Sequence, residues 1–113
     1  MLDQVRLSPS ILHGEFTPDL TAPLLGQTYT LPVGIAPVGM SGLIWPDAER
    51  LLARAATQLG IPYGLSTVAS QKPEDIGPHL NGNGWFQMYP PRDAGIRADM
   101  LCRSCRGCCG SGG

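Results

Sequence analysis

The residues best suited to chemistry in this chain are Ser66, Gln87 and Tyr89, and each stands at or just past the end of an apolar segment. A serine hydroxyl and a glutamine amide both donate and accept hydrogen bonds, so the pair could bind the carbonyls and ring nitrogens of a heterocycle. Tyr89 lies two residues after Gln87, which places both side chains on one face of an extended strand. From pattern alone, they could equally be a polar pair on a half-exposed strand.

A further candidate is main chain rather than side chain. The segment 36–42 reads APVGMSG, and its small residues leave backbone amides and carbonyls open to a flat ring or a phosphate. Its glycines do not match the G-x-G-x-x-G pattern, and the chain contains no P-loop motif. Turns and close packing explain such glycines more often than a ligand does, so the segment alone does not establish a site.

A repeated strand–helix pattern positions these candidates. The run LPVGIA over 31–36 is almost continuously apolar, as is typical of a parallel strand covered on both faces. A helix is predicted from Pro46 to Gly60, with acidic residues near its start, glycine at its end and an apolar stripe that includes Leu51 and Leu59. Further strands are predicted over 61–66 and 85–89, and further helices over 73–80 and from 93 to about 101.

The fold class is therefore α/β. Parallel strands joined by helices cross over in a right-handed sense, so the loops after the three strands share one edge of the sheet, where such folds bind ligands. The prolines and glycines of residues 1–30 permit an extended or hairpin lead-in but no long helix. A TIM (β/α)8 barrel takes about 250 residues. The 113 residues present predict a truncated barrel made of the first three βα units.

Charge and hydropathy exclude several classes of partner. The net charge is −1, and the eight basic residues are dispersed along the chain. They form no basic stripe, so neither a nucleic acid nor a membrane surface is an expected partner. The sequence opens with no leader pattern and contains no apolar run of about 18 residues, so we expect a cytoplasmic protein without a membrane span.

All four cysteines stand in the final segment, in the pattern Cys102-x-x-Cys105-x-x-Cys108-Cys109, followed by glycine and serine. Cys-x-x-Cys turns can place two thiolates on one zinc ion, so a small metal-binding module organised by this tail is one alternative. These four thiolates lie within eight residues, without a second zinc knuckle and without a folded scaffold. A shifted reading frame is the preferred explanation, and we expect residues 102–113 to be foreign to the fold and to hold no metal.

In order, the segments IAPVGMSGLIWPDAE, ARAATQLGIPYGLSTVAS, PEDI and GWFQMYPPRD closely resemble the opening of the FMN-dependent α-hydroxy-acid dehydrogenases and oxidases. This family includes glycolate oxidase, L-lactate dehydrogenase and mandelate dehydrogenase. The resemblance covers about residues 4–101 and divides the chain into a lead-in (1–30), a partial barrel (31–101) and the tail (102–113). It implies part of a homo-oligomeric flavoprotein that uses FMN to oxidise a small L-2-hydroxy acid to a 2-oxo acid.

The resemblance also implies roles for individual residues. Tyr89 falls where a phenol of the family meets the carboxylate or hydroxyl of the substrate. The expected cofactor-binding residues are two side chains that hydrogen-bond the flavin and three residues whose main chain lies along its ring: Ser66, Gln87, Pro37, Val38 and Gly39.

The base of this family is a histidine that takes a proton from the α-hydroxyl of the substrate and lies in a later strand. His13 stands in the lead-in and His79 at the end of a short helix, so neither matches that position. Catalysis needs a positioned base, so we expect no catalytic residue in this chain and no activity from it alone. A non-catalytic α/β fragment without a ligand remains the other alternative.

Overall fold

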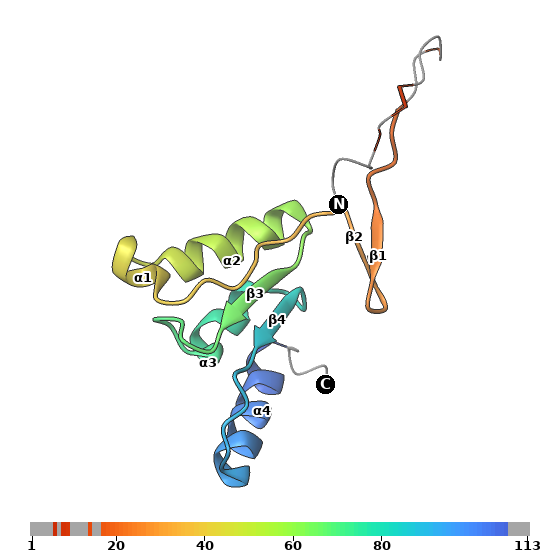
Figure 1. Ribbon diagram of the computed structural model, residues 1–113. Coiled ribbons are helices and arrows are strands. Elements are labelled where there is room, and N and C mark those ends of the chain that lie inside the picture. Colours follow the sequence, from red (N-terminus) through yellow and green to blue (C-terminus); the bar gives the residue numbers. More distant parts are fainter. Residues whose placement is uncertain (1–5, 7, 10–13, 15–16, 109–113) are drawn as a thin grey trace.

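Two parallel strands and the helices packed against them form the body of the structure (Figure 1). The computed structural model describes residues 6, 8, 9, 14 and 17–108. Strand β3 (Tyr63–Ser66) pairs with β4 (Gly84–Gln87), and Ser66 stands opposite Gln87 in the register. The predicted strands over 61–66 and 85–89 are therefore confirmed, although β4 ends before Tyr89.

The prediction of a strand over 31–36 is wrong. This segment is extended and runs parallel to β3, but it forms only a single bridge, between Ile35 and Tyr63. The Ile35 amide donates to the Pro62 carbonyl at 2.9 Å, and the Gly64 amide donates to the Ile35 carbonyl at 2.8 Å. Pro32 and Pro37 have no N–H to donate, so the ladder cannot extend through them.

The lead-in contains a hairpin in its described part. Strands β1 (Ala22–Leu24) and β2 (Gln27–Tyr29) pair antiparallel, and the two turn residues Leu25 and Gly26 both have positive φ angles, as a type I′ turn requires. The hairpin lies on the side of the body away from the arrowheads of β3 and β4 (Figure 1).

The predicted central helix is confirmed as α2 (Ala48–Leu59), with Gly60 in the left-handed conformation at its end. It begins two residues after Pro46, because Asp47 has a φ of 58° and is not helical. A short helix that the sequence pattern missed, α1 (Ser41–Ile44), precedes it.

The two later helices are also present, with different bounds. The segment predicted as one helix over 73–80 divides into α3 (Pro73–Ile76) and the 3₁₀-helix η2 (Gly77–His79), since Pro78 cannot donate an α-helical hydrogen bond. The last helix, α4 (Ala94–Cys108), continues past the predicted end into the cysteine-rich segment.

The hydrophobic core lies between β3 and the helices. Tyr63 and Leu65 alternate with Gly64 and Ser66, so the first pair faces α2 and α3 while the second pair faces the opposite side of the sheet. The buried apolar residues that make up this core are Ala53, Ala56, Ile61, Tyr63, Leu65, Ile76 and Leu80. The buried stripe of α2 is centred on Ala53 and Ala56, whereas Leu51 and Leu59, placed on the stripe by the sequence pattern, are exposed.

The part of the tail that the structure describes is helical and contacts the body. Arg103 of α4 forms a two-pronged ion pair with Glu74 of α3, with Nε–Oε1 and Nη2–Oε2 distances of 2.5 and 3.2 Å, and Ser104 is buried. That residues 102–113 are foreign to the fold remains a prediction.

This ion pair predicts an acid-sensitive contact between α3 and α4. Hydrogen bonding to Arg103 lowers the pKa of Glu74 from 4.5 to about 2. A lowered folded-state pKa contributes stability above the unfolded value, and this stability is lost as the pH falls toward the folded value. We therefore expect Glu74→Gln to flatten the fall of the thermal unfolding midpoint between about pH 4.5 and pH 2.

Thermal scans across that pH range measure the effect, and Asp75→Asn, which changes the exposed neighbouring carboxylate, is the control. Identical pH profiles for the wild-type chain and Glu74→Gln would show that the ion pair contributes no stability.

Candidate functional site

Ser66 and Gln87 lie side by side at the C-terminal edge of the sheet. They are partners in the parallel register, and both point to the face opposite the α2–α3 core. Ser66 is only 4% exposed, and its hydroxyl accepts a hydrogen bond from the Val68 amide at 3.2 Å, which leaves its proton free to donate. Gln87 is half-buried, and its side-chain amide bonds to no other described residue.

The loop after 31–36 packs against the loop after β3. The Met40 amide donates to the Val68 carbonyl at 2.9 Å, and a Cβ on Gly39 would lie only 2.6 Å from the Val68 side chain, so the two loops touch where a larger residue would not fit. Pro37 and Val38 remain exposed. The main chain of 37–39 is thus held beside Ser66, as the sequence pattern predicts.

Thr67 connects the end of β3 to the residues after β4, and the sequence reasoning missed it. Its hydroxyl donates to the Gln87 carbonyl at 2.5 Å and accepts from the Tyr89 amide at 3.0 Å. The side chain of Tyr89 is 60% exposed at this edge. A hydroxyl residue directly after a buried strand was the available signal.

Glu49 is a second residue that the sequence reasoning missed. It belongs to α2, is completely buried, and accepts hydrogen bonds through Oε1 from the Ser70 amide at 2.8 Å and the Gly42 amide at 3.3 Å. Oε2 has no partner among the described residues. One carboxylate therefore joins α1, which contains Gly42, to the loop after β3. Glu49 stands four residues before the buried Ala53, which places it on the buried stripe of α2.

The electrostatics of Glu49 favour its charged form. Burial raises the pKa of this carboxyl, but hydrogen bonds from neighbouring groups, with that of the Ser70 amide the strongest, together outweigh burial and hold the pKa below its usual value. Burial, with the nearby charge of Glu49, also raises the pKa of Tyr63 to about 12. The Tyr63 phenol is therefore protonated at neutral pH and cannot act as a base.

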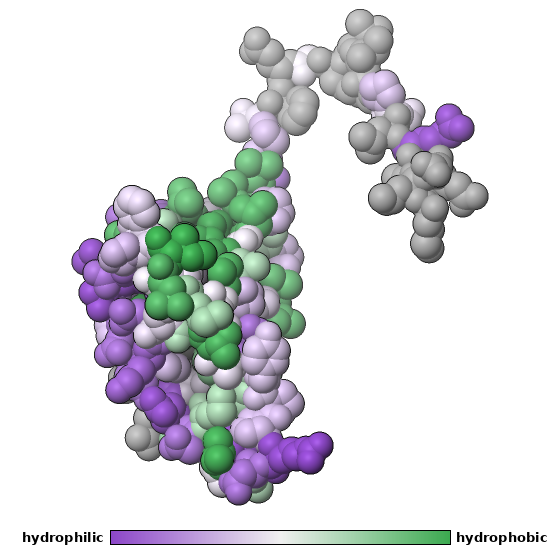
Figure 2. Space-filling view, turned by 60° about the vertical axis from the view of Figure 1, so that its left-hand side comes forward, coloured by the Kyte–Doolittle hydropathy of each residue, from purple (hydrophilic) through white to green (hydrophobic). Residues whose placement is uncertain are grey.

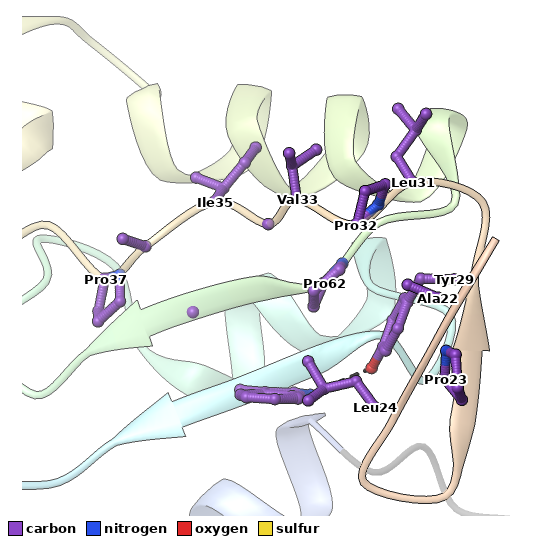
Figure 3. A pocket seen from close by; sticks show the side chains of 14 residues that line it. Ala22, Pro23, Leu24, Tyr29, Leu31, Pro32, Val33, Ile35, Pro37 and Pro62 are labelled. Carbon is purple, nitrogen blue, oxygen red and sulfur yellow. Dashed lines mark hydrogen bonds between the residues drawn. The ribbon is translucent and has the colours of Figure 1, made fainter. Parts of the chain in front are cut away.

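An apolar cavity lies away from this edge. It measures about 460 Å³ and lies between the hairpin, the segment 31–37 and β4, with Leu24, Tyr29 and Pro62 on its walls (Figure 3). Its lining is mostly apolar, and of the candidate residues it includes only Pro37. A smaller cavity of about 210 Å³ includes Ser66 and Thr67 and lies toward α4. The polar groups able to bind a heterocycle gather at the C-terminal edge, so we place the candidate site there.

His79 does not lie at this edge. His79 ends η2, which precedes β4, and its carbonyl accepts a hydrogen bond from the Thr57 hydroxyl at 2.7 Å at the opposite end of the sheet. His13 lies outside the described residues. Arg97 donates to the Pro91 carbonyl at 3.1 Å, and Arg92 is exposed.

The structure describes the side chains of two cysteines of the tail. Cys102 and Cys105 are exposed and unpaired. No group of three or more His, Cys, Asp or Glu side chains close enough to hold a metal ion occurs among the described residues, which do not include Cys109.

The amino-acid sequence also matches a known protein family. The family model described as FMN-dependent dehydrogenase matches residues 1–109, nearly the whole chain. The chain belongs to this family. FMN is the cofactor of the family, and the matched range extends into the cysteine-rich tail.

Individual members of the FMN-dependent dehydrogenase family agree with this assignment. The (S)-mandelate dehydrogenase of Pseudomonas putida is 38% identical over 89 residues, which are 79% of this chain and 23% of that protein. The L-lactate dehydrogenase of Ectopseudomonas mendocina (strain ymp) is 35% identical over 103 residues, 91% of this chain and 27% of that protein. The chain thus spans about a quarter of the length of these relatives.

Solved structures of the family have the same fold in the matched region. A soluble mutant of the membrane-associated (S)-mandelate dehydrogenase of P. putida matches 90% of this chain and 29% of its own, with a TM-score of 0.82 and 34% identity. A mandelate oxidase matches 96% of this chain and 31% of its own, with a TM-score of 0.83 and 31% identity. These neighbours are TIM-barrel enzymes, whereas the described residues here are mixed α/β without a closed barrel.

The mandelate dehydrogenase among these neighbours is membrane-associated. Among the described residues, none of the helices has the length and apolar character needed to cross a bilayer.

Proposed function

We propose that this chain supplies one wall of the FMN site in an enzyme that oxidises a small L-2-hydroxy acid to a 2-oxo acid. The observation that carries the proposal is the placement of Ser66 and Gln87 as register partners beside the exposed main chain of 37–39. FMN, when bound, would supply the two-electron acceptor for this oxidation. The loops after the segment 31–36, after β3 and after β4 would hold one side of the flavin ring.

The donors and acceptors present fit a flavin. The Ser66 hydroxyl keeps a free proton, and the Gln87 amide offers a donor and an acceptor without a partner among the described residues. The small residues of 37–39 allow a flat ring to approach the backbone. These groups would orient the ring and exclude water from one of its faces.

Tyr89 is proposed to contact the substrate. Its phenol is exposed at the same edge, two residues beyond Gln87, and could donate a hydrogen bond to a carboxylate or a hydroxyl. The relatives are named for mandelate and lactate, which are both 2-hydroxy acids. The chain itself is proposed to bind FMN without turnover, because His79 lies away from the edge and the family's base has no counterpart among the described residues.

A flavin titration tests the proposal. Gln87→Leu would leave polar flavin atoms unpaired against the protein, so we expect FMN affinity to fall roughly tenfold or more. FMN fluorescence, recorded while the wild-type chain and the variant are titrated, measures both dissociation constants. Gln58→Leu, the same substitution at an exposed position of α2, is the matched control and should bind FMN as the wild-type chain does. A wild-type chain that leaves FMN unbound would favour the alternative of a fragment without a ligand.

A further inference from the structure

We propose that Thr67 is a positioning residue that sets the geometry of Gln87 and Tyr89 at the flavin site. The inference rests on the proposed function, because it concerns the two residues assigned there to the flavin and the substrate. Its physical basis is a hydroxyl that bonds the main chain of both residues at once. We call this pair of hydrogen bonds the Thr67 bridge.

The Thr67 bridge replaces main-chain pairing at the point where the two strands separate. The ladder between β3 and β4 ends with the pair Ser66 and Gln87. After this pair, the segment that follows β3 turns away from β4, and the Ala69 amide donates to the Ser66 carbonyl at 3.1 Å. The Thr67 side chain replaces the missing main-chain hydrogen bonds here. Its hydroxyl donates to the Gln87 carbonyl and accepts from the Tyr89 amide. The hydroxyl thus holds the main chain on both sides of Met88.

The sequence after Tyr89 gives this bridge particular weight. Pro90 and Pro91 follow directly, and neither has an N–H that could hold the chain to a neighbour. The helix α4 begins only at Ala94. The Tyr89 amide is therefore the last main-chain donor before the two prolines, and its acceptor is the Thr67 hydroxyl. Without the hydroxyl, the end of β4 would be free to move, and the Gln87 and Tyr89 side chains would move with it.

Amide hydrogen exchange of the full 113-residue chain, followed residue by residue by NMR, tests the bridge without any flavin. In the wild-type chain, the Tyr89 amide should be protected, and Thr67→Val, which keeps the shape and removes the hydroxyl, should speed its exchange. Thr67→Ser keeps the hydroxyl and should preserve protection. Unprotected exchange of Tyr89 in the wild-type chain, or equal exchange in the wild-type chain and Thr67→Val, overturns the inference.

FMN titration of the same variants tests the consequence for the site. We expect Thr67→Val to weaken FMN binding about three- to tenfold and Thr67→Ser to restore it to near the wild-type value. Thr57→Val is the matched control, because the Thr57 hydroxyl also bonds a distant main-chain carbonyl, that of His79, but at the other end of the sheet. This control should lower the thermal midpoint and leave FMN affinity unchanged.

The outcomes separate the two proposals. Unchanged FMN affinity in Thr67→Val, an equal loss in Thr57→Val, or a Thr67→Ser variant as weak as Thr67→Val would each overturn the positioning role. A wild-type chain that does not bind FMN would overturn the proposed function, while the Tyr89 exchange rates would still decide whether the bridge holds the end of β4. If Thr67→Val does not fold, the comparison of Thr67→Ala with Thr67→Ser gives the same test.

Discussion

Glu49→Ala is expected to destabilise the chain by about 2–5 kcal/mol, because it removes the acceptor of two amides held against a buried carboxylate. The Ser70 and Gly42 amides would lose their acceptor, the carboxylate of the fully buried Glu49. Each buried donor left without an acceptor costs roughly 1–3 kcal/mol. Helix α1 and the loop after β3, which Glu49 joins, would also separate, and FMN binding should weaken together with stability.

Urea unfolding followed by circular dichroism measures this loss. Glu49→Gln is the informative partner variant, since it keeps one carbonyl oxygen for the two amides while removing the charge. It should cost less than Glu49→Ala. Asp75→Ala, which removes an exposed carboxylate from α3, is the control for the loss of an acidic residue. If the midpoint urea concentration of Glu49→Ala equals that of the wild-type chain, Glu49 does not hold α1 and the loop after β3 together.

Leu65→Ala should produce a loss of similar size for a different reason. Leu65 is fully buried in the middle of β3 and belongs to the cluster formed with α2 and α3. Replacing a buried leucine with alanine loses transfer free energy and leaves a cavity, which together cost about 2–5 kcal/mol. The free energy of unfolding in urea measures the effect.

The control for this prediction is Leu59→Ala in α2, where the side chain is 54% exposed. This substitution should cost much less, because little apolar surface returns to water and no cavity forms. Equal losses for Leu65→Ala and Leu59→Ala would contradict the assignment of Leu65 to the centre of the core.

The sequence predicts the neighbourhood of Ser66 and Gln87 because local rules determine it. Apolar runs locate β3 and β4, and the parallel connection places their ends at one edge. In the structure the parallel register pairs Ser66 with Gln87, so both side chains lie on one face. The same rules predict α2, whose ends depend on the local conformations of Asp47 and Gly60.

Residues that act through long-range hydrogen bonds could not be predicted in this way. Glu49 accepts from Ser70, twenty-one positions away, and Thr67 bonds groups at twenty and twenty-two positions. No periodic pattern encodes such pairs. The apolar character of the segment 31–36 predicts a strand. In the structure it forms only the bridge between Ile35 and Tyr63, because Pro32 and Pro37 on either side have no N–H to continue the hydrogen bonding.

The surface of the molecule is divided between apolar and polar regions. Figure 2 shows green apolar atoms gathered on the upper part of the forward face, with purple polar atoms along its lower and outer parts. The turn of the view brings forward the side of the body that carries α1, where Leu43 and Ile44 are strongly exposed. These side chains lie close to the loop that precedes α1, which is the loop proposed to meet the flavin.

The hydrogen bond between β4 and the hairpin has an optical consequence. The Trp85 indole donates to the Tyr29 hydroxyl at 3.2 Å, and that hydroxyl donates to the Gln27 side chain at 3.2 Å. The only other tryptophan, Trp45, follows α1 and is 65% exposed. The chain therefore carries two intrinsic chromophores in unlike surroundings, one recording whether the hairpin is docked and the other recording the solvent beside the loops of the C-terminal edge.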